Sequence, residues 1–564
     1  MSNQVSWPEP VACSFENSSP TRREFLTRIR GTAALTLASG AVTSGSSAKA
    51  GQLLAGGIAS GSADRVLDSY QNRLQAARAE ANIAVPTQTA NGDEQTYPNF
   101  IGNFSKGLPH APSGEVVADA YGKLLDAVRE GTATAFEDVP LGGNTPLVNP
   151  LAGVALDLEG TDSHQLAIPA FPPVASRDLA DQAIELYWMA LCRDVNFLDY
   201  KSNPLTRAAA AELARLPRFN GITPSSLFRG FTREDLIGPY VSQFLLKPFN
   251  YGPYALSGTM RMYVPGINYM TGHTSWLNVQ NGAGPFASNK FESAPRYTCT
   301  GRDLTVYVHA DPNAGLLISF YNAGIWLFEQ NAPLNQGNPY TRHKTQIGFA
   351  TFGVPHFLCL LGEAKQRACK AAWYAKWFVH RALRPEAYGG LVHMTATRQA
   401  HYPVQADILN SATLANVHSN YGTYFLPQAF PEGSPQHPSY PQGHATMAGA
   451  CATILKAAFD GSVQFNTLNN GTIVTANEDG SGLLPYRDTD TNDITVNGEI
   501  NKLASNIGQA RDFAGIHWRS DYEWGLQLGE AVAISVLRDQ RNNYVGEDFE
   551  GFTITKLDGT TITV

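Results

Sequence analysis

Apolar side chains recur at intervals of three and four residues along much of the chain, which is the spacing of one face of an α-helix. The pattern holds over residues 63–82 and 115–130, where polar residues fill the opposite face. It returns over residues 178–200, which have an aromatic, mostly apolar middle, and over the alanine-rich residues 206–216. Pro204 interrupts the pattern between these last two segments, because proline cannot continue a helical hydrogen-bond ladder. We therefore expect four helices in this part of the chain.

The helical periodicity is lost over residues 249–292, which are rich in Gly, Asn, Tyr and Pro and predict an irregular region. Helices are expected to resume from Asp303, and residues 551–564 have the pattern of a short strand-like tail. No internal repeat or low-complexity linker separates the predicted helices. The pattern predicts a mainly α fold with long irregular loops and few short strands, built as a single mostly helical domain over residues 51–564.

Composition is that of a protein with a packed core, with 43% hydrophobic and 10% aromatic residues among 564. The formal net charge is −8, whereas a surface for nucleic acid or anionic lipid normally carries a basic excess. No run of 18 or more apolar residues is present, so the sequence predicts no membrane-spanning segment. We expect neither nucleic acid nor a membrane span, and any anion site must be local.

The N-terminus has the order of features of a twin-arginine export signal. Arg22 and Arg23 lie within the run TRREFL, a small-residue, modestly apolar stretch follows over residues 31–42, and Ala48-Lys49-Ala50 resembles a cleavage site. Residues 1–50 are therefore expected to be an export signal, and the mature protein to be periplasmic or extracellular. The alternative is an N-terminal tail whose paired arginines occur by chance.

Six cysteines are present, and five of them follow Ala50. Cys359 and Cys369 lie on one predicted helix about 15 Å apart, too far to bridge each other. No zinc-type spacing of cysteines occurs, and a dense disulfide framework is excluded. At least one thiol is expected to be free or to pair between subunits.

The first group of candidate functional residues belongs to a predicted helix over residues 356–383. At 100° per residue, Trp373, Lys376, His380 and Arg384 fall within an arc of about 80°, so one face presents an aromatic ring and three nitrogen-bearing groups. Pro385 ends the segment. Such a face favours an anion, although Lys376 or Arg384 alone would more simply fit a solvated face or a charge that complements the helix dipole.

The second group is the run HPSYPQGH, residues 437–444, which leads into an alanine- and glycine-rich helix extending to Phe459. Pro441 and Gly443 mark a tight turn into the helix N-terminus, where free backbone N–H groups and the helix dipole favour a bound anion. His444 is then expected to lie beside that anion.

The third group is RDFAGIHWRSD, residues 511–521, which supplies Arg511 and His517. If the chain is helical there, Asp521 lies one turn beyond His517 and accepts its Nδ1 proton, which leaves Nε2 free to bond an electrophilic centre. A lone histidine near an aspartate is more often structural. Together, the three groups predict an oxyanion site within residues 356–525.

The order Lys376-x7-Arg384-Pro385, Pro441-x-Gly443-His444 and Arg511-x5-His517-x3-Asp521 resembles the signature shared by vanadium haloperoxidases and type 2 phosphatidic acid phosphatases. The runs KWFVHRALRPE and HPSYP resemble the algal and cyanobacterial bromoperoxidases specifically. The likeness extends to ELYWMALCRD, DLIGPYVSQFLL and SGTMRMYVPGINYMTGHTSWLNVQNG, and so covers most of the chain. The resemblance implies a fold of helical bundles with the active site at the end of a bundle, and a homo-oligomer.

By this resemblance the cofactor is vanadate, and the reaction is the oxidation of bromide, and of iodide, by hydrogen peroxide. The product would be a hypohalous acid equivalent that halogenates small organic acceptors. Lys376, Arg384 and Arg511 would donate hydrogen bonds to the vanadate oxygens, with the backbone N–H of Gly443. Lys376 would also help to polarise the bound peroxide. His517 would bond vanadium through Nε2, oriented by Asp521, and His444 would move protons.

Two positions depart from the family pattern or divide the family. Gln442 stands where the family usually has serine; its amide can donate a hydrogen bond but is longer, so it either contacts a vanadate oxygen or turns away. At position 373, red-algal members tend to have arginine, whereas brown-algal and fungal relatives have tryptophan, as this chain does. His437 matches the bromoperoxidases, so bromide is the expected halide. His380 is expected to support the site from outside the vanadate contacts, or to be a structural histidine.

Two other functions share this signature. A soluble, acid phosphatase-like phosphohydrolase could use His517 as the nucleophile, because phosphate and vanadate have the same shape and charge. A non-catalytic vanadate- or phosphate-binding protein is the second alternative, with turnover lost through Gln442. The long N-terminal half and its likeness to the peroxidases favour the haloperoxidase.

Overall fold

The computed structural model describes residues 63–309, 317–544 and 546–564, all within one compact unit, Ala59–Val564. The predicted export signal lies outside the described residues. The longer helices are α2 (Ala63–Ala81), α4 (Ala118–Glu130), α6 (Arg177–Cys192), α7 (Pro204–Leu213), α8 (His273–Gln280), α9 (Gly301–Tyr307), α10 (Leu317–Glu329), α11 (Val354–Tyr374), α12 (Pro385–Ala396), α14 (Ala412–Tyr421), α15 (Gly443–Ala458), α16 (Val496–Phe513) and α17 (Arg519–Arg541). Short helices are α3 (Asp93–Thr96), α5 (Ala133–Glu137) and α13 (Ala406–Leu409).

Strands are few and short, and they pair as four separate two-stranded antiparallel sheets among the described residues. The pairs are β1 (Phe249–Tyr251) with β2 (Tyr254–Leu256), β3 (Met260–Tyr263) with β4 (Phe291–Arg296), β5 (Val474–Ala476) with β6 (Leu483–Pro485), and β7 (Thr553–Thr555) with β8 (Thr561–Thr563). The last pair is the predicted strand-like tail, folded as a hairpin with Ile554 opposite Ile562. The mainly α prediction is confirmed.

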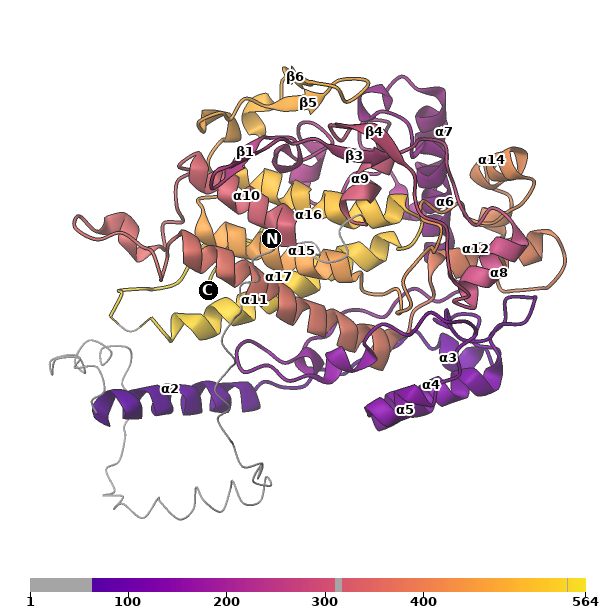
Figure 1. Cartoon of the computed structure of the whole chain (residues 1–564), viewed down its shortest axis with the longest axis horizontal. Helices are drawn as coiled ribbons and strands as arrows, with labels where there is room; N and C mark the ends of the chain where they lie inside the picture. Colours follow the sequence, from indigo (N-terminus) through magenta and orange to yellow (C-terminus); the bar gives the residue numbers. More distant parts are fainter. Residues whose placement is uncertain (1–62, 310–316, 545) are drawn as a thin grey trace, which may run out of the picture. The chain divides into compact units, whose positions relative to one another are not determined.

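A central bundle is formed by α11, α15, α16 and α17, in which α15 packs against the other three helices (Figure 1). Every residue of α15 except His444 is buried. Helices α15 and α17 approach closely because both carry glycine at the contact: a Cβ at Gly529 would lie 1.9 Å from the Thr446 carbonyl oxygen, and one at Gly449 would lie 2.1 Å from that of Leu526. Small residues therefore let the two backbones meet.

Two predicted boundaries are wrong. The helix predicted over residues 178–200 ends at Cys192, because the next residues make tertiary contacts: the buried Arg193 guanidinium donates to the Phe513 carbonyl (2.7 Å), and Asp194 pairs with Arg302. The region 249–292, predicted to be irregular, contains β1, β2, β3, the start of β4 and α8. Pro204 is the first residue of α7 and is compatible with that position, because the first-turn N–H has no helical partner.

None of the described helices combines the length and hydropathy needed to cross a membrane. The five cysteines from Cys192 onward are all free thiols; Cys192, Cys299 and Cys451 are buried, and Cys359 is exposed. The described residues therefore contain no disulfide.

Candidate oxyanion site

The predicted site residues lie where four bundle helices begin or end. Helices α15 and α17 begin there, with Gly443 and Arg519, and α16 ends there after Arg511. Helix α11 also reaches this end and continues into a π-helical turn, Ala375–His380, that carries Lys376. The predicted residues therefore meet at one end of the helical bundle.

Lys376 is completely buried, and its ammonium group is held by backbone carbonyls. Its Nζ donates to the carbonyl oxygens of Pro438 at 2.7 Å and Ser439 at 2.6 Å. The lysine thereby fixes the turn that leads into α15. The π-helical turn was not predicted; turns of this kind are frequent at functional sites.

Arg384 is brought to the site, but not by the route predicted. The helix ends at His380, because Arg381 adopts a left-handed conformation (φ 40°), so Arg384 does not share a helical face with Lys376. Arg384 instead precedes Pro385 as the N-cap of α12. Its Nη1 donates to the Ile516 carbonyl at 2.8 Å and lies 2.9 Å from His517 Nε2, while Nη2 donates to the His437 carbonyl at 2.8 Å.

The predicted contact between His517 and Asp521 is present, with 2.6 Å between His517 Nδ1 and Asp521 Oδ2. The helical geometry assumed for His517 is wrong, because α17 begins at Arg519. Asp521 faces His517 because it also caps this helix, accepting the Trp518 backbone N–H at 3.1 Å. Ser439 donates its hydroxyl to the same carboxylate oxygen. Since a carboxylate only accepts, His517 carries its proton on Nδ1 and presents Nε2 as an acceptor.

Arg511 and His444 meet at one backbone carbonyl. Arg511 Nη1 donates to the Val308 oxygen at 3.2 Å, and His444 Nε2 lies 3.1 Å from the same atom. A carbonyl can only accept, so His444 carries its proton on Nε2 and its lone pair on Nδ1. Arg511 also lies over the Phe430 ring, 5.8 Å from its centroid.

Gly443 is the first residue of α15, and Gln442 is its N-cap. A Cβ at Gly443 would lie 2.9 Å from the Trp373 ring and 3.9 Å from Lys376 Cε, so glycine keeps this N-terminus open to a close neighbour. The Gln442 side chain turns toward α16, where its Nε2 donates to the Gly508 carbonyl at 3.1 Å. Its Oε1 is buried without a hydrogen-bond partner among the described residues. The Gln442 amide is thus directed toward α16.

The remaining three residues differ in their relation to the site. The Trp373 ring packs on the His437 ring at 4.7 Å between centroids and donates Nε1–H to the Val148 carbonyl at 3.0 Å. His437 is tied to Arg384 through its carbonyl, as above. His380 packs edge-on against Tyr440, and neither of its ring nitrogens has a hydrogen-bond partner among the described residues. No hydrogen bond in the described part of the chain joins His380 to the other predicted residues.

Electrostatically, the site is an excess of buried positive charge. Among the described residues, Lys376, Arg384 and Arg511 form no ion pair with a carboxylate, although each is buried. Burial lowers the pKa of Arg384 to about 9 and that of Arg511 to about 10. Burial, reinforced by Arg384, lowers the pKa of Lys376 well below its ordinary value. An unpaired buried charge costs several kcal/mol, roughly, so this arrangement is one that an anion would relieve.

The histidines are held neutral. Burial and then the positive charge of Arg384 lower the pKa of His517, and burial and then Arg511 lower that of His444. Burial, followed by Lys376, lowers the pKa of His437. Neutral imidazoles retain a lone pair, which is the form that can bond a metal or accept a proton.

Sequence reasoning missed two groups in the site. Ser439 holds Asp521, and the Val308 carbonyl holds both Arg511 and His444. Ser439 lies within the HPSYP run and could have been included for its hydroxyl. Val308 contributes a backbone atom from more than 130 residues before His444, and nothing in its side chain signals that role.

Comparison with known proteins identifies the family. The chain is 34% identical to the vanadium-dependent bromoperoxidase of Ascophyllum nodosum over 534 residues, which cover 87% of this chain and 93% of that protein. The chain belongs to the vanadium-dependent bromoperoxidase family. It is also 32% identical to the vanadium-dependent bromoperoxidase of Corallina pilulifera, over 89% of this chain and 98% of that protein.

Two further similarities agree with membership of the bromoperoxidase family. Residues 356–545 match the family model of the VCPO second helical-bundle domain, a range that contains all the predicted oxyanion residues. The homohexameric structure of the second vanadate-dependent bromoperoxidase from Ascophyllum nodosum has a TM-score of 0.83 and 30% identity, and covers 95% of each chain. The resemblance stated from the sequence motifs is thereby confirmed.

Proposed function

We propose that the protein is a vanadate-dependent bromoperoxidase, which uses hydrogen peroxide to oxidise bromide, and iodide, to a hypohalous acid equivalent that halogenates small organic acceptors. The observation that carries the proposal is the convergence on a neutral histidine, whose Nε2 is an acceptor, of three buried cations that have no carboxylate partner among the described residues. The names of the relatives favour a peroxidase over a phosphohydrolase or a non-catalytic binding protein.

The residues present fit vanadate. Lys376, Arg384 and Arg511 supply positive N–H donors, and the Nε of Arg511 is a buried donor without an acceptor in the part of the chain that the structure describes. The start of α15 adds a backbone N–H at Gly443, where a side chain would collide with Trp373. When bound, vanadate would activate hydrogen peroxide for two-electron oxidation of a halide without changing its own oxidation state.

His517 would bond vanadium through Nε2. The Asp521 carboxylate fixes the proton on Nδ1, and the Ser439 hydroxyl and Trp518 N–H fix the carboxylate in turn. This chain of hydrogen bonds orients the imidazole before the ligand arrives, so little ordering is required on binding. Neutral His517, rather than its imidazolium form, is the species that binds.

His444 would move protons during turnover. Because the Val308 carbonyl holds the proton on Nε2, the basic atom is Nδ1, which accepts a proton as hydrogen peroxide enters and is deprotonated. Burial and Arg511 keep the resting histidine neutral and therefore able to accept. Arg511, which shares the Val308 carbonyl, would keep this imidazole beside the bound oxyanion.

Bromide is the proposed halide. The His437 ring packs against the Trp373 ring and is neutral. A halide beside these two rings would therefore meet an aromatic ring and a neutral imidazole, not a further cation. Iodide, the more easily oxidised halide, would also be a substrate. Gln442 contributes no hydrogen bond to vanadate in this proposal, because its amide is directed to Gly508.

Two further proposals concern the protein as a whole. We propose a homo-oligomer, supported by the homohexamer named for the Ascophyllum nodosum relative. We also propose that residues 1–50 form a twin-arginine export signal for a periplasmic or extracellular protein whose remaining residues, 51–564, form one domain. The order of features from Arg22 to Ala50 supports the export proposal.

The test is a halogenation assay of phosphate-free protein with and without added orthovanadate. With bromide and hydrogen peroxide, the vanadate-loaded protein is expected to brominate a phenolic dye, and the untreated protein is not. Hydrolysis of a phosphomonoester without any vanadate-dependent bromination would instead establish the phosphohydrolase. Tight vanadate binding with neither activity would establish the binding protein.

A further inference from the structure

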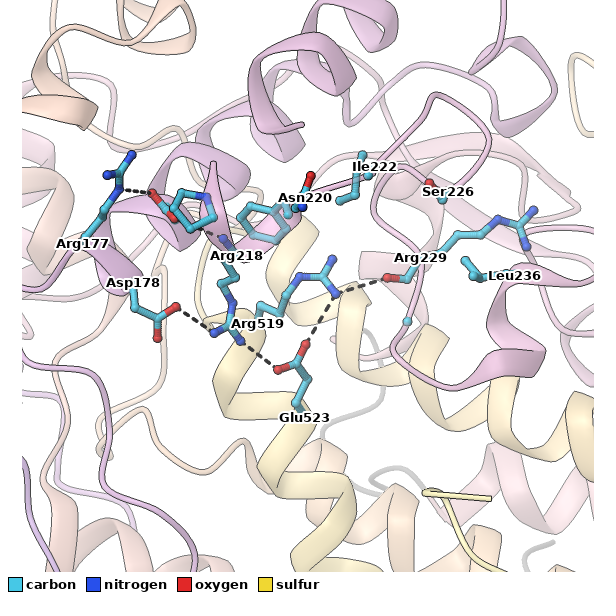
Figure 2. Close-up of a pocket in the computed structure, with 15 residues that line it drawn as sticks. Arg177, Asp178, Arg218, Asn220, Ile222, Ser226, Arg229, Leu236, Arg519 and Glu523 are labelled. Carbon is cyan, nitrogen blue, oxygen red and sulfur yellow. Dashed lines mark hydrogen bonds and ion pairs between the residues drawn. The ribbon is translucent and has the colours of Figure 1, made fainter. Parts of the chain in front are cut away.

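A pocket of about 810 Å³ lies against the first turn of α17, lined in part by Arg519 and Glu523 (Figure 2). None of the residues proposed to contact vanadate lines it. Figure 2 shows Arg218 between Asp178 and Glu523, with 2.8 Å to each carboxylate. Arg177, Arg218 and Arg519 each pair with a carboxylate, whereas Arg229 donates to the backbone carbonyls of Asp235 and Gly238. The feature that bears on the oxyanion site is Arg519, whose side chain is fixed beside this pocket.

Arg519 is the first residue of α17 and forms a buried ion pair with Glu185 of α6. Its Nε lies 2.8 Å and 3.0 Å from the two carboxylate oxygens, and its Nη2 also donates to Glu185. The Arg519 side chain is 9% exposed and that of Glu185 is 1% exposed. The guanidinium also donates to the Tyr522 hydroxyl at 2.9 Å and lies over the Phe219 ring.

A second contact from α6 acts on the same turn. The Gln182 Oε1 accepts the backbone N–H of Ser520 at 3.0 Å. Arg519 and Ser520 are therefore both held by α6, and they are the two residues immediately before Asp521. A cation at a helix N-terminus opposes the helix dipole, so Arg519 would not be expected there without a carboxylate partner. Glu185 provides that partner and immobilises the turn.

We propose that Glu185 and Arg519 are positioning residues for vanadate binding. They do not touch the oxyanion; they fix the start of α17, which sets the place of the Asp521 carboxylate and through it the orientation of His517. The inference rests on the proposed function. Glu185 belongs to the run ELYWMALCRD and Arg519 to the run HWRSD. Neither residue has a role in the proposed vanadate contacts. A shift of the His517 ring would weaken its bond to vanadium, because support of this kind normally contributes about 10- to 100-fold to metal affinity or activity.

Three variants test the proposal by isothermal titration of phosphate-free protein with orthovanadate, with thermal unfolding measured alongside. Glu185→Gln keeps the shape and removes the charge, and is expected to weaken orthovanadate binding by about tenfold or more. The double variant Glu185→Met/Arg519→Met replaces the ion pair by apolar groups, an exchange that can preserve stability. It is expected to unfold near the wild-type temperature and still bind orthovanadate more weakly.

Glu523→Gln is the matched control. Glu523 lies on the same helix and lines the pocket, with its carboxylate 3.7 Å from Arg519 and 2.8 Å from Arg218, its closer partner. Its substitution should leave orthovanadate affinity within about twofold of wild type, since it removes the same charge from the same neighbourhood without releasing Arg519 from Glu185.

The outcomes separate the two proposals. Wild-type affinity in a stably folded double variant would overturn the positioning role while leaving the proposed function intact. A wild-type protein that binds no orthovanadate would overturn the proposed function and this inference with it. Failure of both Glu185 variants to fold would assign the pair to folding alone, and would also overturn the inference.

Discussion

Substitution of Gln442 by serine should tighten orthovanadate binding. The glutamine amide donates to the Gly508 carbonyl, and its Oε1 is buried without a partner in the described part of the chain. A serine hydroxyl at the N-cap can accept an N–H from the first turn of α15 and donate its own proton to a bound oxyanion. One hydrogen bond to a charged group contributes about 1.5–3 kcal/mol, which corresponds to roughly 10- to 100-fold in affinity.

The stability of this variant should change little. Removing three buried heavy atoms costs about 2–3 kcal/mol if the space is not refilled. Against this stand the new N-cap interaction, about 1 kcal/mol, and the relief of an unsatisfied buried oxygen, about 1–3 kcal/mol. Gln442 itself makes no side-chain cap to α15, so no existing cap is lost. With the lost hydrogen bond to Gly508 counted as a further cost of about 1 kcal/mol, the terms balance to within about 2 kcal/mol.

The dissociation constant is measured by titrating phosphate-free protein with orthovanadate and recording the bromination rate at each concentration. Gln509→Ser is the control, because Gln509 is also buried with an unsatisfied amide atom but lies inside α16, where serine gains no cap. The control should be less stable than Gln442→Ser and should bind orthovanadate as wild type does. An unchanged dissociation constant in a folded Gln442→Ser protein would refute the proposed geometry of the α15 N-terminus.

Three further predictions follow from the site and its surroundings. His517→Ala should lose vanadium on gel filtration, whereas His444→Ala should retain part of it and lose turnover; equal vanadium content in the two variants would contradict the assigned roles. Orthophosphate at a hundredfold excess over its Kd should fill the cation site and raise the free energy of unfolding of the vanadate-free protein by about 2.7 kcal/mol, measured as a higher unfolding temperature. Lys376→Met should reduce this stabilisation, and chloride at equal ionic strength should not reproduce it. Burial raises the pKa of Asp235 to about 6, opposed by hydrogen bonds from Thr232 and Ser505. Because the folded pKa exceeds the unfolded one, the contribution of Asp235 to the free energy of unfolding is present below about pH 4 and is lost as pH rises through about 6, by up to about 3 kcal/mol. Urea unfolding of wild type and Asp235→Asn at intervals from pH 4 to pH 7 should show this difference in slope, and parallel curves would rule it out.

The sequence was sufficient to predict the residue types of the site and the end of the bundle where they meet, because spacing and helix signals are local properties. The contact between His517 and Asp521 was predicted correctly, but the assumed helix at His517 was wrong. His517 precedes the N-cap of α17 and Asp521 is its third residue, and a four-residue spacing brings these two positions into contact as well. Periodicity therefore predicted the contact without predicting the backbone.

Other features depended on tertiary contacts that no local pattern records. The shared face of Lys376 and Arg384 was wrong because the backbone turns left-handed at Arg381, where an ion pair with Glu94 holds the side chain. The direction of Gln442 is decided by a carbonyl of α16, and the tautomer of His444 by a carbonyl of Val308. Each is a backbone atom distant in sequence, so composition and motif could not specify it.

The π-helical turn at residues 375–380 amounts to one residue more than an α-helix of the same rise would need. An α-helix turns about 100° per residue, so one inserted residue would rotate everything after it by that amount relative to Trp373 and Lys376, whereas the wider π-helical turn absorbs the extra residue. Arg381 thereby keeps its ion pair with Glu94, and the chain still enters Arg384 in the direction that the site requires. A second inserted residue would have no such turn to absorb it, so this segment should tolerate substitution far better than lengthening.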